Sequence, residues 1–354
     1  MVAVADITHD AASLNRFVES IQRFCDLRRG FPAYLAGSKD FLSLIERLAE
    51  STKEYVSAFP ANLPSNPDDY QVYRQELLTL RYAWFDMHRL VKPIADADTL
   101  HLPGSLINAM MRRLRSVPSF QDSKLAILHI SELNYLQVIA SGVRDTITKI
   151  ADFVGSSLSF PPDLGLIGIP YSQADSVLLN SLIAHEMGHF VFEKQQLKDD
   201  LAPKIEASLD PAFKPAMDLL QKQQIDANSL KRIPSVLASW TEELFCDLFA
   251  IRFIGPCYSY AFIELFDLSN YMNRDGTLRI KAGAPPLQFS HSYPGHLYRL
   301  QKQAEMLRTL GWWTHIQNSQ ATSQKLLEHA EALPASSFCF PFHVGLQKCF
   351  IDLT

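Results

Sequence analysis

Apolar residues recur at helical spacing through the first third of the chain. They fall at intervals of three and four residues, which predicts amphipathic helices with one buried face. The proline at position 93 is expected to end the longest of these helices, because the residue before a proline is disfavoured in helical conformation. The predicted helices span 10–29, 41–56, 70–91 and 106–114. A helical N-terminal region over residues 1–120 is therefore predicted.

The middle of the chain mixes strand and helix signals. Residues 124–130 and 164–170 form short apolar runs, and the second is bounded by prolines, so both are predicted to be strands. Residues 133–153 have helical periodicity. Two interpretations of 164–170 stay open. As an exposed edge strand it could pair with an extended peptide, and as a core strand it would only pack.

A nearly continuous apolar run over 177–192 contains three polar side chains that carry chemistry. They form the pattern His185-Glu186-Met-Gly-His189. Residues four apart lie one turn above each other on a helix, so both histidines can reach one metal ion at about 2.0–2.1 Å. Glu186 lies one step round the helix and can act as a general base toward a water that the metal activates.

A simpler interpretation of these histidines is a hydrogen-bonded pair in an ordinary core. Two histidines and a glutamate are costly to bury without partners. Their position within so apolar a run therefore favours a metal site.

A second helical pattern, over 236–254, offers the third ligand that a catalytic zinc site needs. Glu243 and Asp247 are four residues apart and share a helix face. A carboxylate here can bind the metal, and the acid one turn later can accept a hydrogen bond from a ligand histidine. Glu242 and Asp247 are rivals to Glu243 as the third ligand.

These two helices together resemble the gluzincin group of zinc metallopeptidases, including its heat-shock and prenyl-protein protease branch. The shared pattern is His185-Glu186-x-x-His189 followed by Glu243-x-x-x-Asp247, and Ala250 extends it. The resemblance implies that His185, His189 and Glu243 bind Zn²⁺. It also implies that Glu186 is the general base and that Asp247 orients a ligand histidine.

The resemblance covers about 181–192 and 239–250 only. The 53 residues between His189 and Glu243 exceed the short spacing of the thermolysin-like branch. The membrane-spanning helices of the prenyl-protease branch are not expected in this sequence, since no stretch of about 18 apolar residues is free of charge. The subgroup and the substrate therefore stay open.

A third segment, from Ser290 to Arg299, loosely resembles the region where the heat-shock branch carries a further histidine and an arginine. A histidine or tyrosine donor there could stabilise the oxyanion of the reaction. His291 is the first candidate, followed by Tyr293 and His296. Arg299 is expected to anchor this segment or the Asp/Glu network.

Composition narrows the class of protein. The net charge of −5 and the lack of a strongly basic stripe argue against a nucleic-acid partner. No secretion signal is expected, and the five scattered cysteines indicate reduced thiols in a cytoplasmic protein.

The sequence therefore predicts an α+β, predominantly α-helical protein. Its catalytic domain, over 121–354, would have a zincin-like core with a small sheet over the motif helix. The predicted function is a zinc-dependent metallopeptidase acting on peptide or protein substrates, without membrane insertion. The alternatives are a zinc-binding regulatory protein without turnover and a metallohydrolase acting on another amide or an ester.

Overall fold

A computed structural model of the chain describes most of its regular elements. The described residues are 4–29, 36–58, 69–97, 104–130, 136–137, 140–170, 173, 176–201, 203, 233–266, 295–316, 324–325, 327–328 and 330. They form two compact units, Met1–Asp175 and Ser176–Thr354. The predicted boundary near residue 120 falls inside the first unit, before its sheet.

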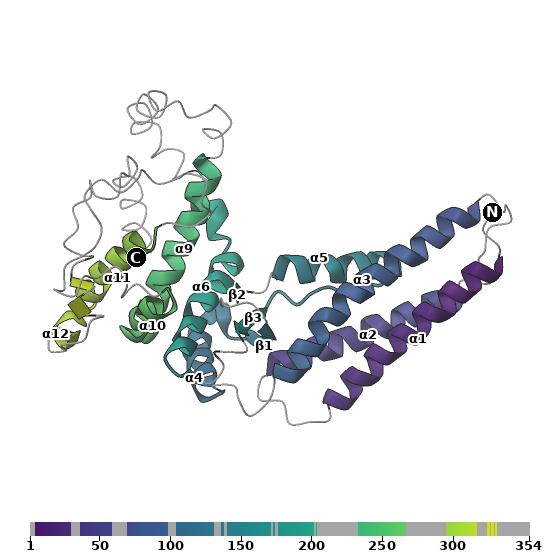
Figure 1. The fold of residues 1–354 in the computed structure, drawn as a ribbon, viewed down its shortest axis with the longest axis horizontal. Helices are drawn as coiled ribbons and strands as arrows, with labels where there is room; N and C mark the ends of the chain where they lie inside the picture. The colour runs from purple at the N-terminus through teal and green to yellow at the C-terminus, as the bar shows by residue number, and fades with distance from the viewer. Residues whose placement is uncertain are drawn as a thin grey trace. The chain divides into compact units, whose positions relative to one another are not determined.

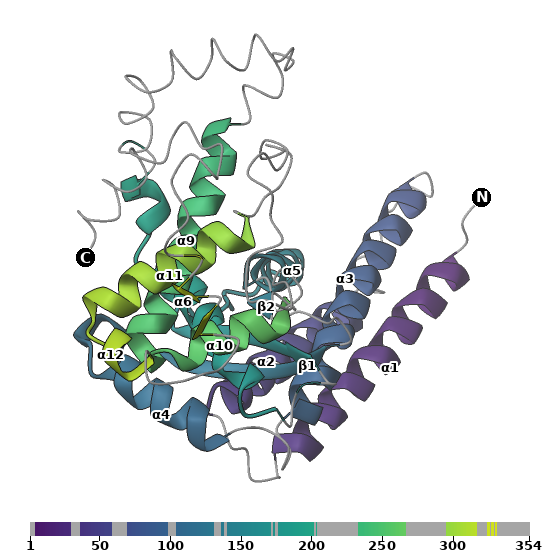
Figure 2. The same ribbon diagram turned by 60° about the vertical axis from the view of Figure 1, so that its left-hand side comes forward.

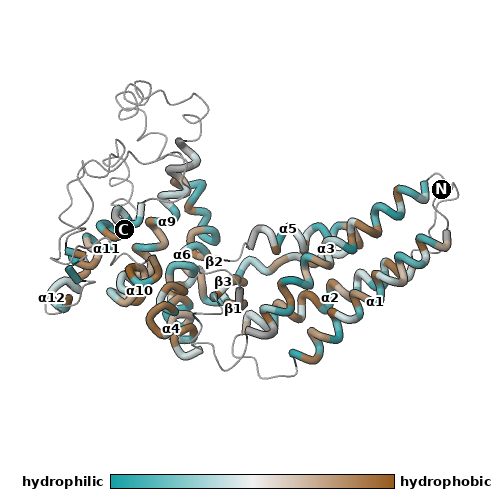
Figure 3. Tube along the Cα trace, viewed as in Figure 1, coloured by the Kyte–Doolittle hydropathy of each residue, from teal (hydrophilic) through white to brown (hydrophobic). Residues whose placement is uncertain are grey.

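In its described residues, the first unit combines five α-helices with a small sheet (Figure 1). Its helices are α1 (Val4–Arg29), α2 (Ala36–Ala58), α3 (Tyr70–Ala97), α4 (Gly104–Arg115) and α5 (Ala140–Phe153). Hydrophobic and hydrophilic positions alternate along α1 and α3, as the amphipathic pattern predicts (Figure 3). The helix α3 does not end before Pro93 but continues to Ala97. A proline removes one hydrogen bond, and the burial of Ile94 in the core favours continuation.

The sheet has the strand order β1-β3-β2. The strands β1 (Lys124–Ile130) and β3 (Leu164–Pro170) pair in parallel over their whole length, and β2 (Leu136–Gln137) pairs with β3 in antiparallel fashion. The helix expected over 133–153 is therefore wrong at its start, since β2 precedes α5. The edge-strand interpretation of 164–170 is also wrong, because β3 is the central strand and is buried throughout.

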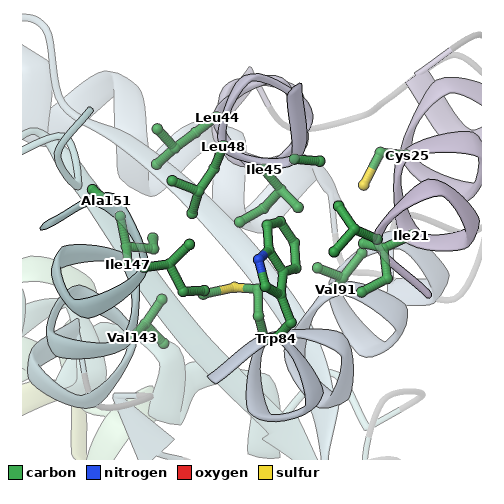
Figure 4. Close-up of a cluster of buried hydrophobic side chains, with 14 of the residues drawn as sticks. Ile21, Cys25, Leu44, Ile45, Leu48, Trp84, Val91, Val143, Ile147 and Ala151 are labelled. Atoms are coloured by element: carbon green, nitrogen blue, oxygen red, sulfur yellow. The ribbon is translucent and has the colours of Figure 1, made fainter. Parts of the chain in front are cut away.

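The core of the first unit gathers around Trp84 of α3 (Figure 4). Its indole ring lies among side chains from α1, α2 and α5, including Ile21, Leu48 and Ile147. The buried indole N–H donates to the Thr52 hydroxyl at 3.1 Å. Helices and sheet thus share one core, and for that reason the sheet belongs with the N-terminal helices.

The second unit is helical in its described residues (Figure 2). A 3-10 turn, Leu179–Leu182, leads into α6 (Ile183–Lys194), which packs against α9 (Ile233–Ile254). The helices α10 (Cys257–Leu265) and α11 (His296–Thr309) also pack against α9, and the short α12 (Trp313–Ile316) follows α11. In the described part of the chain, every helix is too short or too polar to cross a membrane.

The chain is thus α+β and predominantly helical, as predicted. The sheet lies in the first unit and the motif helix in the second, so the zincin-like core with a sheet over the motif helix stays a prediction. Cys25, Cys246 and Cys257 are free thiols, as expected. Cys339 and Cys349 lie outside the described residues.

Candidate metal centre

The helix α6 places the two histidines of the motif side by side. Their ring centroids lie 4.9 Å apart and the ring planes are nearly perpendicular, at 84°. The His185 and His189 side chains are only 9% and 14% exposed. One turn of helix thus brings two imidazoles together in a mostly buried setting, as their spacing predicts.

Glu243 of α9 faces both histidines. One carboxylate oxygen, Oε2, lies 3.4 Å from His185 Nε2, and the other, Oε1, lies 3.6 Å from His189 Nε2. Two ligand atoms held about 2.0–2.1 Å from one tetrahedral zinc ion are separated by about 3.4 Å. Each of the two nitrogen–oxygen separations is thus close to that between neighbouring zinc ligands, and the two histidines face different oxygens of the carboxylate.

Cys246 is a second possible donor from α9. Its thiol sulfur forms a group with one nitrogen from each of His185 and His189 in which all atoms lie within 4.8 Å of one another. Burial raises the pKa of the Cys246 thiol well above its usual value, and the surrounding carboxylates raise it further. Because metals bind the thiolate, the raised pKa weighs against Cys246, and Glu243 and Cys246 are both candidates for the third ligand.

Close contact between the two helices depends on Gly188, the fourth residue of the motif. A Cβ atom on Gly188 would lie 2.8 Å from the Cα of Cys246, which is closer than real Cβ contacts allow. Only glycine permits this approach. The motif glycine therefore sets the distance at which Glu243 faces the histidines.

Asp247 is fully buried beneath His185. Its Oδ1 lies 3.0 Å from His185 Nδ1, the nitrogen on the side away from Glu243. Arg299 donates to both carboxylate oxygens of Asp247 at 2.7 Å, and its third nitrogen, Nη1, lies 3.2 Å from Glu243 Oε2. The structure thus brings Asp247 to the position expected of an orienting acid, and Arg299 joins the Asp/Glu network as expected.

Glu242, a rival candidate for the third metal ligand, contacts a histidine nitrogen on the side away from Glu243. Its Oε1 lies 2.9 Å from His189 Nδ1, so it contacts the nitrogen that faces away from Glu243. Glu242 therefore holds His189 much as Asp247 holds His185. The sequence shows two adjacent acids, Glu242 and Glu243, in this helix. Helical spacing alone does not predict which acid faces which histidine nitrogen.

Tyr258 of α10 was not anticipated. Its hydroxyl donates to Asp247 Oδ1 and lies 3.1 Å from His185 Nδ1. The sequence places Tyr258 in an aromatic, apolar stretch after the break at Gly255-Pro256. No periodic relation connects it with the motif helices, because a separate helix carries it.

These contacts shift the acidity of the buried groups. Burial lowers the pKa of His185, but its interactions with Asp247 and Glu243 outweigh burial and raise this pKa to about 9. Burial raises the pKa of Asp247, but Arg299 and His185 outweigh it and hold this pKa well below its usual range. For the same reason the pKa of Glu243 is lowered by His185, Arg299 and His189 despite burial. In the absence of a metal, the two carboxylates thus favour the protonated form of His185.

Glu186 is buried on α6, next to His185 in the chain. Its carboxylate lies near enough to Cys246 to contribute to the raised pKa of that thiol. Its role as a general base stays a prediction.

The downstream segment is described only from Gly295 onward. His291 and Tyr293, the candidate oxyanion donors, lie outside the described residues. His296 begins α11, where its ring packs against Phe266 with centroids 4.0 Å apart. Burial and the nearby Arg299 lower the pKa of His296 below its usual value. His296 therefore combines an aromatic contact with a preference for the neutral form.

No protein family, curated protein or solved structure was found to match this chain.

Proposed function

We propose that this protein is a zinc-dependent hydrolase, most simply a metallopeptidase of the gluzincin kind. One observation carries the proposal. Two histidine Nε2 atoms face the two oxygens of one carboxylate, Glu243, at 3.4 and 3.6 Å. His185, His189 and Glu243 would hold the zinc ion and leave a fourth position for water or substrate, as catalytic zinc sites do.

When bound, zinc would supply Lewis-acid chemistry that makes water more acidic and polarises a carbonyl group. Protein side chains would carry out the proton transfer and orient the ligands. Glu186 would take a proton from the attacking water and pass it to the leaving amine. Asp247 and Glu242 would hold the Nδ1 sides of the two histidines, so that both Nε2 atoms point to the ion.

The charge balance of the site supports this proposal. Arg299 compensates Asp247 and Glu243, and zinc would take the place of the proton that these two carboxylates favour on His185. Three acids, Asp247, Glu243 and Glu242, lie against the two histidines, and a dication between the imidazoles would add compensation for their charge.

The first test is the metal content of full-length protein purified without a metal-affinity tag, measured by elemental mass spectrometry. About one zinc per chain is expected in the wild type and far less in His185→Ala. Absence of zinc from the wild type, even after zinc is added back, would overturn the proposal.

Turnover is tested next, on peptides and small amides or esters. Glu186→Gln should keep zinc but lose hydrolysis by about 100-fold or more, the range of a general base. Glu193→Gln is the matched control, because Glu193 is an exposed carboxylate on the same helix. A zinc-loaded wild type without any hydrolysis would favour a regulatory zinc protein. Hydrolysis of small amides or esters but not of peptides would favour a metallohydrolase that acts on another amide or an ester.

A further inference from the structure

Tyr258 is the buried hydroxyl at the centre of the acid network under His185. The residue is 1% exposed, and its hydroxyl is in reach of both Asp247 Oδ1 and His185 Nδ1. The phenol and imidazole rings lie in parallel planes. This contact therefore bears on the orientation of one of the proposed ligands.

The hydrogen-bond partners near His185 Nδ1 show which bonds the Tyr258 hydroxyl can make. A neutral imidazole that offers Nε2 to a metal carries its proton on Nδ1. Two acceptors lie within reach of that proton, Asp247 Oδ1 at 3.0 Å and the Tyr258 oxygen at 3.1 Å. A hydroxyl can accept this N–H and donate to Asp247 at the same time, whereas the guanidinium of Arg299 can only donate.

The position of Tyr258 depends on a sharp break between two helices. Gly255 ends α9 with φ of +71°, a conformation that favours glycine, and α10 starts at Cys257. The reversal brings Tyr258 back to Asp247, although eleven residues separate the two in the chain. A third helix thus contributes a polar group to a site built mainly on α6 and α9.

His189 lacks a comparable second contact in the described part of the chain. The partner of its Nδ1 is Glu242, whose side chain is 31% exposed, whereas that of Asp247 is 0% exposed. The two proposed ligands are therefore held unequally. His185 Nδ1 contacts the buried acid Asp247 and Tyr258, and Arg299 in turn holds Asp247.

We infer that Tyr258 is a positioning residue of the proposed zinc centre, fixing the His185 ring and the Asp247 carboxylate so that His185 Nε2 faces the metal. This inference rests on the proposed function, since it assigns a role toward the zinc site. The phenyl ring of Tyr258 fills space in the core, and the hydroxyl carries the positioning.

The test compares Tyr258→Phe with Tyr260→Phe in full-length protein. Tyr260 lies two residues away on the same helix and points to a different side of it, so Tyr260→Phe removes the same hydroxyl away from the site. Zinc affinity is measured by competition with a chelator, and the visible absorption of the cobalt-substituted protein reports the geometry of the ligands. Tyr258→Phe should weaken zinc binding by about 10- to 100-fold and change the cobalt spectrum, whereas Tyr260→Phe should leave both unchanged.

A wild-type zinc affinity and cobalt spectrum in Tyr258→Phe would overturn the inference, and the hydroxyl would then serve packing alone. If Tyr258→Phe does not fold, nitrogen-15 NMR of the histidines in zinc-loaded wild type decides, with His185→Gln for assignment. A slowly exchanging Nδ1–H on His185 is expected, and fast exchange with water would contradict the role. Absence of zinc from the wild type would instead be the failure of the proposed function.

Discussion

Gly188 of α6 lies directly against the backbone of Cys246 in α9. A Cβ atom on Gly188 would come within 2.8 Å of the Cys246 Cα and 3.1 Å of its Cβ. Backbone atoms cannot move away as the end of a flexible side chain can. The two helices that carry the proposed zinc ligands are therefore in close backbone contact at this glycine.

Gly188→Ala should separate α6 from α9. The expected cost is about 1–3 kcal/mol of stability from overpacking, less the roughly 1 kcal/mol by which alanine favours a helix over glycine. Zinc affinity should fall as well, because Glu243 moves away from both histidines. Urea unfolding and zinc competition measure the two effects.

Gly104→Ala is the control for this prediction, since a Cβ at Gly104 meets no atom within 4 Å. It should leave stability and zinc affinity close to the wild type. Equal behaviour of the two variants would show that the helices are not in close contact at Gly188.

The stability of the metal-free protein should depend on pH through His185. Its pKa is raised to about 9 by Asp247 and Glu243 despite burial, against about 6.5 in an unfolded chain. A raised pKa stabilises the fold fully below pH 6.5, and this contribution is lost as the pH rises through 9. The loss is on the order of 3 kcal/mol.

Urea unfolding between pH 6 and 9, with a chelator present, measures this loss. His185→Gln should flatten the decline, while His315→Gln, at an exposed histidine of α12, should not. Zinc loading should also flatten the decline, because the ion takes the place of the proton. A stability that rises between pH 6.5 and 9 in the metal-free wild type would contradict the assigned cation.

Much of the fold was predictable because periodicity reports which face of an element is buried. The strands 124–130 and 164–170 have the predicted bounds, and α9 begins at Ile233 rather than at 236. The secondary-structure prediction was wrong at the start of 133–153, where the apolar pattern is compatible with both a helix and a strand. Apolar residues at 133–153 fit a helix, but the strand β2 takes part of this segment, because pairing with β3 overrides local periodicity.

In the candidate site, too, relationships within one helix were predictable from the sequence and contacts between helices were not. Spacing within one helix predicted that His185 and His189 lie together and that Asp247 lies one turn from Glu243, since helix geometry is local. It could not predict that Glu242 faces His189 or that Tyr258 reaches Asp247. Those contacts join different helices, and only tertiary packing decides them.

Arg299 should be essential to the stability of the second unit. Its side chain is 5% exposed and makes two hydrogen bonds to Asp247, which is fully buried. Arg299→Met leaves a buried carboxylate uncompensated, which costs about 3–5 kcal/mol. Arg299→Lys should recover only part of this, because an ammonium group cannot make the two parallel bonds.

A double variant separates stability from metal binding. Arg299→Met with Asp247→Leu removes both charges, and such replacements are often neutral for stability. Urea unfolding should show most of the stability regained, while zinc affinity stays low because His185 has lost its acid. Arg252→Met, at an exposed arginine of α9, is the control. If Arg299→Met is as stable as the control, the buried network contributes little.

The choice of third ligand can be tested directly at the two adjacent acids. Glu243→Ala removes a proposed ligand, so its zinc affinity should fall further than the roughly 10- to 100-fold expected from losing a residue that orients a ligand. Glu242→Ala should show that smaller loss, because Glu242 contacts only the far nitrogen of His189. Glu242→Gln should lose least, since its amide oxygen can still accept the N–H.

Two further variants complete this comparison in the same chelator competition. Cys246→Ala should bind zinc nearly as the wild type does if Glu243 is the ligand, and much more weakly if the thiol is. Glu264→Ala, at an exposed acid of α10, controls for the loss of a nearby negative charge. Equal losses in Glu242→Ala and Glu243→Ala would remove the distinction between ligand and orienting acid. A loss confined to Cys246→Ala would move the third ligand to the cysteine.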